Sequence, residues 1–159
     1  MGFVISPESL KNTLKRIDEA QKAVHDAIVD AFAEVGEYVT EQIRNGSMSE
    51  WFNDTGALRS SVGYAVGKRG ETVRISDFGV IMQGADGSRK GKALAERLVS
   101  EYSTFDYVLI LVAGEEYAVY VEAIENKIVL SSGWLYIKKN LTKVLKQKIT
   151  EALKKNMKN

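Results

Sequence analysis

The first third of the chain carries apolar side chains at intervals of three, four and seven residues. Ser6 and Pro7 open this stretch with a capping residue followed by a proline at the first helical position, and Asn45-Gly46 closes it. Gln21 is the one polar interruption. The apolar positions are Leu10, Leu14, Ile17, Val24, Ile28, Ala31, Val35 and Tyr38. The pattern predicts one helix over 7–44, after a flexible start at 1–6, with a length of about 57 Å.

This helix is long for a chain of 159 residues. A compact domain of that size is roughly 30 to 40 Å across. The helix therefore bends, breaks at Gly36, where glycine weakens a helix, or projects and finds a partner.

Residues 45–130 show the alternation and turn residues of a sheet region. After a polar loop at 45–56, "SSVGYAVG" and "ETVRISDF" predict two strands joined by a turn at 67–70. A glycine-rich loop is expected at 83–92, followed by a short helix to about Tyr102. The most apolar run, "YVLILVAG", predicts a central strand. "EEYAVYVEAI" fits a strand or one to two helical turns, and "NKIVL" fits a short strand or an extended entry to the last helix.

The chain closes with a second amphipathic pattern, which predicts a helix over 131–156 with lysines on the faces opposite its apolar stripe. A long helix, a hairpin, a helix, further strands and a closing helix favour an α+β fold. We expect one domain over 1–159 with a mainly antiparallel sheet of about four strands, a short middle helix and a basic C-terminal helix.

The amino-acid composition excludes several kinds of site and segment. The chain has no cysteine and one histidine, so disulfides, thiolate ligands and His-rich zinc sites are not expected. No apolar run approaches the roughly 20 residues that span a bilayer, and no export signal is expected. Charge is uneven: residues 7–44 hold five basic and eight acidic side chains, whereas residues 131–159 hold eight lysines and one glutamate.

One short string suggests an aspartic protease. Asp54-Thr55-Gly56-Ala57 matches the sequence around the catalytic carboxylate of the retropepsin-like enzymes. Such enzymes bring two carboxylates about 3 Å apart, and the chain has one copy of the string, preceded by a loop rather than an apolar strand. We therefore interpret Asp54-Thr55-Gly56 as a turn in which the glycine adopts positive φ.

Two other candidate sites are weak. Gly87, Gly91 and Lys92 suggest a phosphate-binding loop, but three residues rather than four separate the glycines and Ala93 follows the lysine. His25 has no neighbouring cluster of ligands in the sequence. We expect no catalytic residue, no metal ligand and no cofactor.

Basic side chains point to acidic partners in two places. Arg89, Lys90 and Lys92 form a candidate partner-contact loop, and the terminal lysines can meet nucleic acid phosphates, solvent, or the acidic long helix of a neighbouring subunit.

Two separated motifs resemble the tail-completion, or head-to-tail joining, proteins of long-tailed bacteriophages and prophages. The first motif is carried by Thr55, Gly56, Leu58, Arg59, Ser61 and Val62, and the second by Gly114, Tyr117, Ala118, Tyr120, Val121 and Glu122. The resemblance implies a non-enzymatic virion protein of the tail or neck that assembles in the host cytoplasm. It also implies a ring of identical subunits, commonly six, that contacts the tail tube and the head connector.

The residue types suggest how the motifs cooperate. Leu58 can anchor the turn in the core, and Arg59 offers a rigid donor fork for the carboxylate of Glu122. We therefore expect an Arg59–Glu122 pair, with Tyr117 and Tyr120 as packing residues.

Overall fold

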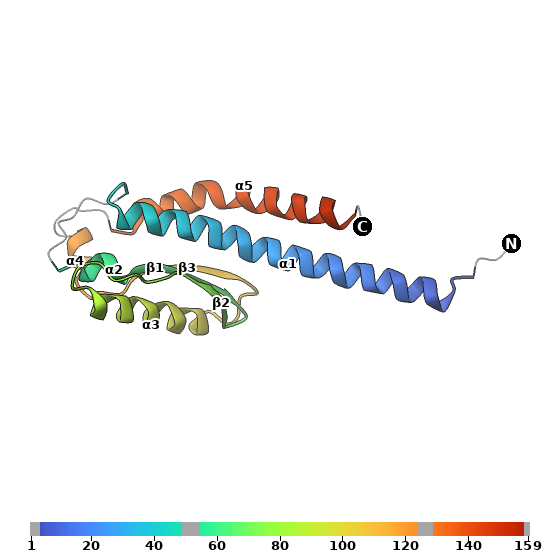
Figure 1. Ribbon diagram of the computed structural model, residues 1–159, viewed down its shortest axis with the longest axis horizontal. Helices are drawn as coiled ribbons and strands as arrows, with labels where there is room; N and C mark the ends of the chain where they lie inside the picture. Colours follow the sequence, from blue (N-terminus) through green and yellow to red (C-terminus); the bar gives the residue numbers. More distant parts are fainter. Residues whose placement is uncertain (1–3, 49–54, 124–128, 158–159) are drawn as a thin grey trace.

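The computed structural model describes residues 4–48, 55–123 and 129–157. Its elements in chain order are α1 (Pro7–Arg44), α2 (Ala57–Ser61), β1 (Val62–Lys68), β2 (Glu71–Ile75), α3 (Ala85–Glu101), β3 (Val108–Ala113), α4 (Ala118–Ala123) and α5 (Ser131–Asn156). The antiparallel helices α1 and α5 lie on one side of the sheet and α3 lies on the other (Figure 1). The predicted α+β fold, with a long N-terminal helix and a closing helix, is confirmed.

The first helix is continuous from Pro7 to Arg44. The Ser6 hydroxyl accepts a hydrogen bond from the Ser9 N–H at 3.1 Å, as its capping role requires. A break at Gly36 was one of the alternatives, and the helix is unbroken there. A Cβ at this position would lie 2.6 Å from Cδ2 of Tyr64, so Gly36 is the point at which α1 crosses closely over the sheet.

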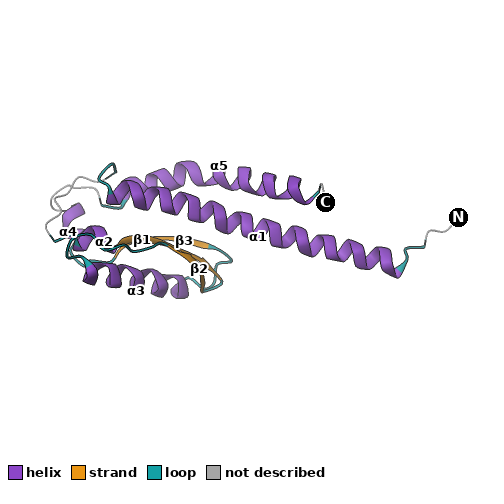
Figure 2. Cartoon of the chain, viewed as in Figure 1, coloured by secondary structure: helices purple, strands orange, loops and turns teal. Residues whose placement is uncertain are grey.

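The sheet has three antiparallel strands in the order β2-β1-β3 within the described residues, not about four (Figure 2). The predicted turn between β1 and β2 is present, with positive φ at Arg69 and Gly70. Part of "EEYAVYVEAI" forms α4, and the first three residues of the candidate segment "NKIVL", 126–128, lie outside the described residues.

The strand β3 pairs with β1 but is not central in the sheet. Its apolar side chains are explained by the helices that cover both faces: Leu109 and Leu111 pack toward α1 and α5, whereas Val112 packs toward α3. Burial on both faces produces the same continuous apolar run as a central position does.

The glycine-rich stretch at 83–92 is mostly helical, because α3 begins at Ala85. Gly87 and Gly91 are four residues apart and therefore share one face of the helix, which is buried against α2 and β1. Close backbone packing overrides the low helix propensity of this sequence, so the predicted loop is wrong.

The N-terminal end of α1 extends beyond both the sheet and the end of α5 (Figure 1). On this end Leu10, Leu14 and Ile17 are 53%, 54% and 47% exposed. Of the alternatives for so long a helix, the structure has the projecting end. In the described part of the chain, no helix combines the length and the apolar character that crossing a bilayer demands.

Candidate functional site

The first motif forms the turn that leads into α2 and then β1. Thr55 Oγ1 accepts a hydrogen bond from the Ala57 N–H at 3.3 Å, and Gly56 has φ +81°. Leu58 is buried in the main core, as expected. The Ser61 hydroxyl donates to the Leu58 carbonyl at 2.8 Å, which closes the short helix before β1 begins. Asp54, the residue of the protease string, lies outside the described residues.

The two motifs meet through backbone atoms. The Gly114 N–H donates to the Ser61 carbonyl at 3.1 Å, which joins the end of β3 to the end of α2. The helix α3 also passes here: a Cβ at Gly91 would lie 2.3 Å from the Ser61 oxygen, and one at Gly114 would lie 2.4 Å from the Gly91 nitrogen. Three segments therefore approach at a distance that only glycine allows.

The predicted Arg59–Glu122 pair does not occur among the interactions that the structure describes. Arg59 donates to the carbonyl of Arg44 at 2.7 Å, so it holds the C-terminal end of α1. Glu122 accepts hydrogen bonds from the N–H groups of Leu130 and Ser131 at 3.4 and 3.1 Å. Each charged side chain therefore forms hydrogen bonds with backbone groups at the end of a helix, where these groups lack partners within the helix.

The environment of Glu122 favours its ionised form. Partial burial alone would raise the pKa of this carboxyl, but hydrogen bonds from Ser131 and from the Leu130 and Val129 backbone outweigh burial and lower the pKa. A carboxylate is thus held at the start of α5, where the positive end of the helix dipole stabilises it.

The three basic residues expected to contact a partner lie on α3 rather than on a loop. Lys90 Nζ is 2.9 Å from Asp86 Oδ2 and 3.1 Å from Glu115 Oε2. Its pKa is raised first by the hydrogen bond to Asp86 and then by that to Glu115. Arg89 pairs with Asp86, and Lys92 is exposed. Of these three residues, Lys90 lines the depression described next.

A depression of about 600 Å³ lies between α3, the end of β3 and α4. We call it the motif depression; it is lined by Lys90, Ala93, Leu94, Arg97, Ala113, Gly114, Glu115, Glu116, Ala118, Val119, Glu122, Val129 and Leu130. Val119 is 71% exposed, whereas Glu115 is 7% exposed and neutralised by Lys90. Its lining thus combines apolar side chains with five charged ones, one of which, Glu115, is buried.

The remaining residues of the second motif are divided between core and surface. Val121 packs against the main core, Ala118 is buried within it, and Tyr117 is 42% exposed. Tyr120 lies in α4, and its side chain is not among those that the structure describes.

Several contacts could not be found from sequence spacing. Glu115 and Lys90 are 25 residues apart, and His25 Nδ1 lies 2.9 Å from the Tyr107 hydroxyl across 82 residues. His25 thereby links α1 to the segment before β3. Within 4–48, 55–123 and 129–157, no three His, Asp or Glu side chains gather in a group that could hold a metal ion.

Comparison of the chain with protein-family models, with curated proteins and with solved structures finds no match.

Proposed function

We propose that this chain is a structural protein of a long-tailed bacteriophage or prophage virion. In this role it completes the tail, or joins the tail to the head, as a ring of identical subunits at the tail end facing the capsid. Its activity is assembly rather than chemistry, and its partners are its own copies, the tail-tube protein and the head connector.

The observation that carries this proposal is the convergence of the two motifs. Residues 55–62 and 114–122 carry the resemblance, and the Gly114–Ser61 hydrogen bond joins them beside the motif depression. The two sequence motifs that carry the resemblance therefore lie at one place in the fold. That place is a concave surface with apolar and charged side chains, a combination that suits contacts with another protein.

A deletion of the gene in its phage or prophage tests the function. We expect induced cells to accumulate separate heads and tails by negative-stain electron microscopy, and expression of the chain in trans to restore joined particles. The restored particles should contain the chain by mass spectrometry. Normal particles after deletion would overturn the proposal.

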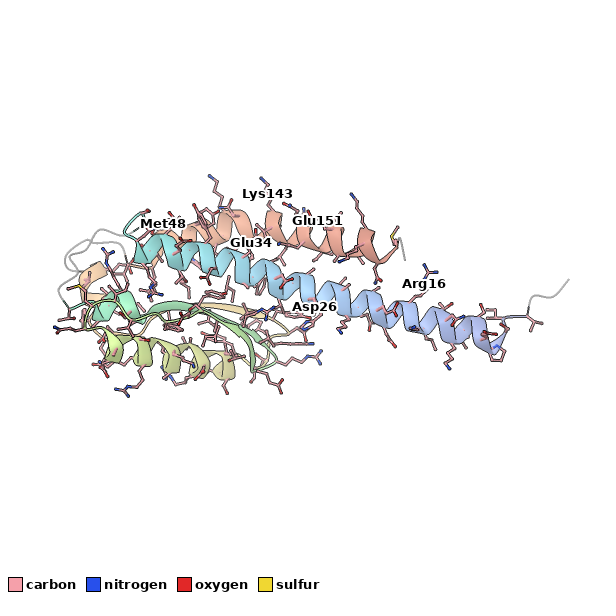
Figure 3. The ribbon with its side chains drawn as sticks, viewed as in Figure 1. Arg16, Asp26, Glu34, Met48, Lys143 and Glu151 are labelled. Carbon is pink, nitrogen blue, oxygen red and sulfur yellow. The ribbon has the colours of Figure 1, made fainter. Side chains whose placement is uncertain are left out.

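A second candidate function, nucleic acid binding, is favoured by the outer face of α5. Lys139, Lys143 and Lys146 are exposed, and Figure 3 shows Lys143 on the side of α5 away from α1. The described ion pair between α5 and α1 uses a different lysine, Lys148, whose Nζ lies 2.7 Å from Glu34 Oε2.

Binding to a DNA duplex distinguishes the two candidates. Contacts to phosphate lower the logarithm of the association constant by about 0.9 per contact for each tenfold rise in salt. If nucleic acid is the main partner, submicromolar binding should persist near 150 mM salt, and replacing Lys139, Lys143 and Lys146 by glutamine should abolish it. Binding that is absent at this salt concentration would reject the second candidate.

A further inference from the structure

We propose that the N-terminal arm of one subunit, residues 4–18, docks into the motif depression of a neighbouring copy of the same chain. The inference rests on the proposed function, because it identifies the two surfaces through which a ring would form.

The N-terminal arm has little contact with the rest of the described subunit, apart from Arg16, which lines a hollow with Leu153 and Met157 at the end of α5. Its residues are exposed throughout, including the three large aliphatic side chains Leu10, Leu14 and Ile17. These lie at spacings of four and three, so they share one face of α1. Helices in proteins are stabilised mainly by packing of an apolar face, and this face of the arm is exposed to water.

The motif depression offers the complementary surface. Ala93, Leu94 and Ala118 supply apolar contacts, and Val119 stands exposed beside them. A row of aliphatic side chains on a helix is a common ligand for an apolar groove of this kind.

Charge favours the same pairing. The N-terminal arm contains Lys11, Lys15 and Arg16 against the two acids Glu8 and Asp18, which gives a net charge of +1. The motif depression is lined by three carboxylates and two cations, and Glu116 is exposed. Lys11 and Lys15 flank the apolar face of the arm, where they can approach such a rim.

The two surfaces lie at opposite ends of the molecule, with the N-terminal arm projecting at one end and α4 at the other (Figure 1). One subunit therefore cannot fill its own depression. Contact between unlike surfaces of successive copies is heterologous, and such contacts close into rings when the rotation between subunits permits. Three half-exposed aliphatic side chains make a small contact, so each contact is weak and a ring gains stability from many of them.

The absence of cysteine in the sequence allows a direct test. Leu14→Cys and Val119→Cys each place one thiol on an exposed site, and Val80→Cys provides a matched control, because Val80 is 57% exposed and does not line the depression. The variants are mixed in pairs at high concentration under mild oxidation, and disulfide-linked products are separated by mass. The L14C and V119C mixture should yield the mixed dimer several-fold above the L14C and V80C mixture.

Three results would overturn the docking: equal yields from both mixtures, a predominance of L14C homodimers, or no linked product. L14C homodimers would indicate instead that two arms pack against each other. The double variant L14C/V119C should give a ladder of linked oligomers, whereas a chain that cross-linked within itself would contradict the separation of the two surfaces.

A charge variant tests the same contact without cross-linking. Leu14→Lys should abolish ring formation, measured by sedimentation velocity or on purified tails, while Asn12→Lys adds the same charge to another face of the arm and should leave it unchanged. If wild-type rings form and L14K does not weaken them, the docking fails and the proposed function stands. If the specific cross-link forms but the chain is absent from virions, the proposed function fails and the contact stands.

Discussion

Gly36 of α1 lies directly against the ring of Tyr64 on β1: a Cβ at position 36 would come within 2.6 Å of Cδ2 and 2.7 Å of Cγ. The Tyr64 ring is packed between α1 and the sheet and is 5% exposed. The long helix can cross the sheet at this depth only where it has no side chain.

Gly36→Ala should therefore destabilise the protein, although alanine favours helix by about 1 kcal/mol. Overpacking of a core costs roughly 1 to 3 kcal/mol, so after the gain in helix propensity we expect a net loss of up to about 2 kcal/mol in the free energy of unfolding. Urea denaturation followed by circular dichroism measures it. In a double-mutant cycle with Tyr64→Ala the two changes should show favourable coupling, and purely additive effects would contradict the close contact.

Gly91→Ala should be more damaging than Gly36→Ala. The new methyl group would meet the Ser61 carbonyl oxygen at 2.3 Å, and a backbone atom cannot rotate away as a side chain can. We expect a loss of at least about 3 kcal/mol, or failure to fold, by thermal denaturation. Lys92→Ala, at the exposed next position of α3, is the control and should leave the midpoint nearly unchanged.

Glu122→Gln should give a pH-dependent loss of stability. The folded-state pKa of Glu122 lies below its ordinary value of 4.5, so the ionised carboxylate stabilises the fold above that pH and loses this effect as pH falls through the lowered pKa. Relative to wild type we expect a loss of about 0.5 kcal/mol at pH 7, because the charge at the α5 dipole is removed. The difference should shrink toward pH 3.

Parallel thermal melts at pH 7 and pH 3 measure this difference. Glu116→Gln removes an exposed carboxylate of the same segment and serves as the control. A wild-type advantage over E122Q that grew as the pH fell would contradict the assignment of Glu122 to the start of α5.

Lys90→Ala should lower the denaturation midpoint, whereas Lys92→Ala should not. Lys90 neutralises Glu115, whose side chain is 7% exposed, and a buried carboxylate without its partner is strongly unfavourable. Adding Glu115→Gln to Lys90→Ala should recover most of the loss, since no buried charge then remains. If K90A and K92A melted alike, Lys90 would have no structural role, and its contribution would be confined to contacts with a partner.

Sequence patterns located α1 and α5 well because their boundaries depend on local signals: Ser6-Pro7, Asn45-Gly46, and apolar stripes that need no knowledge of neighbours. The start of α3 was not predictable in this way. Gly87 and Gly91 are unfavourable in an isolated helix, and the contacts with Ala57 and Ser61 that require them exist only after the chain has folded.

The candidate site shows the same limit. The two motifs predicted that residues 55–62 and 114–122 lie close together in the fold. Their residue types predicted an ion pair between Arg59 and Glu122. The structure joins them instead through the Gly114 N–H and the Ser61 carbonyl. Contacts between backbone atoms do not depend on side-chain type, so in the sequence they are indicated only by the glycines that permit them.

The continuity of α1 has a geometric consequence for any assembly built through its projecting end. A helix of 38 residues without a break fixes the distance between the sheet of a subunit and the surface that its arm reaches. The helix would then act as a ruler for the spacing of neighbours, and hence for the diameter of the ring. Seven residues inserted between Glu19 and Ala20 would preserve the apolar face, extend the arm by about 10 Å and enlarge or open the ring.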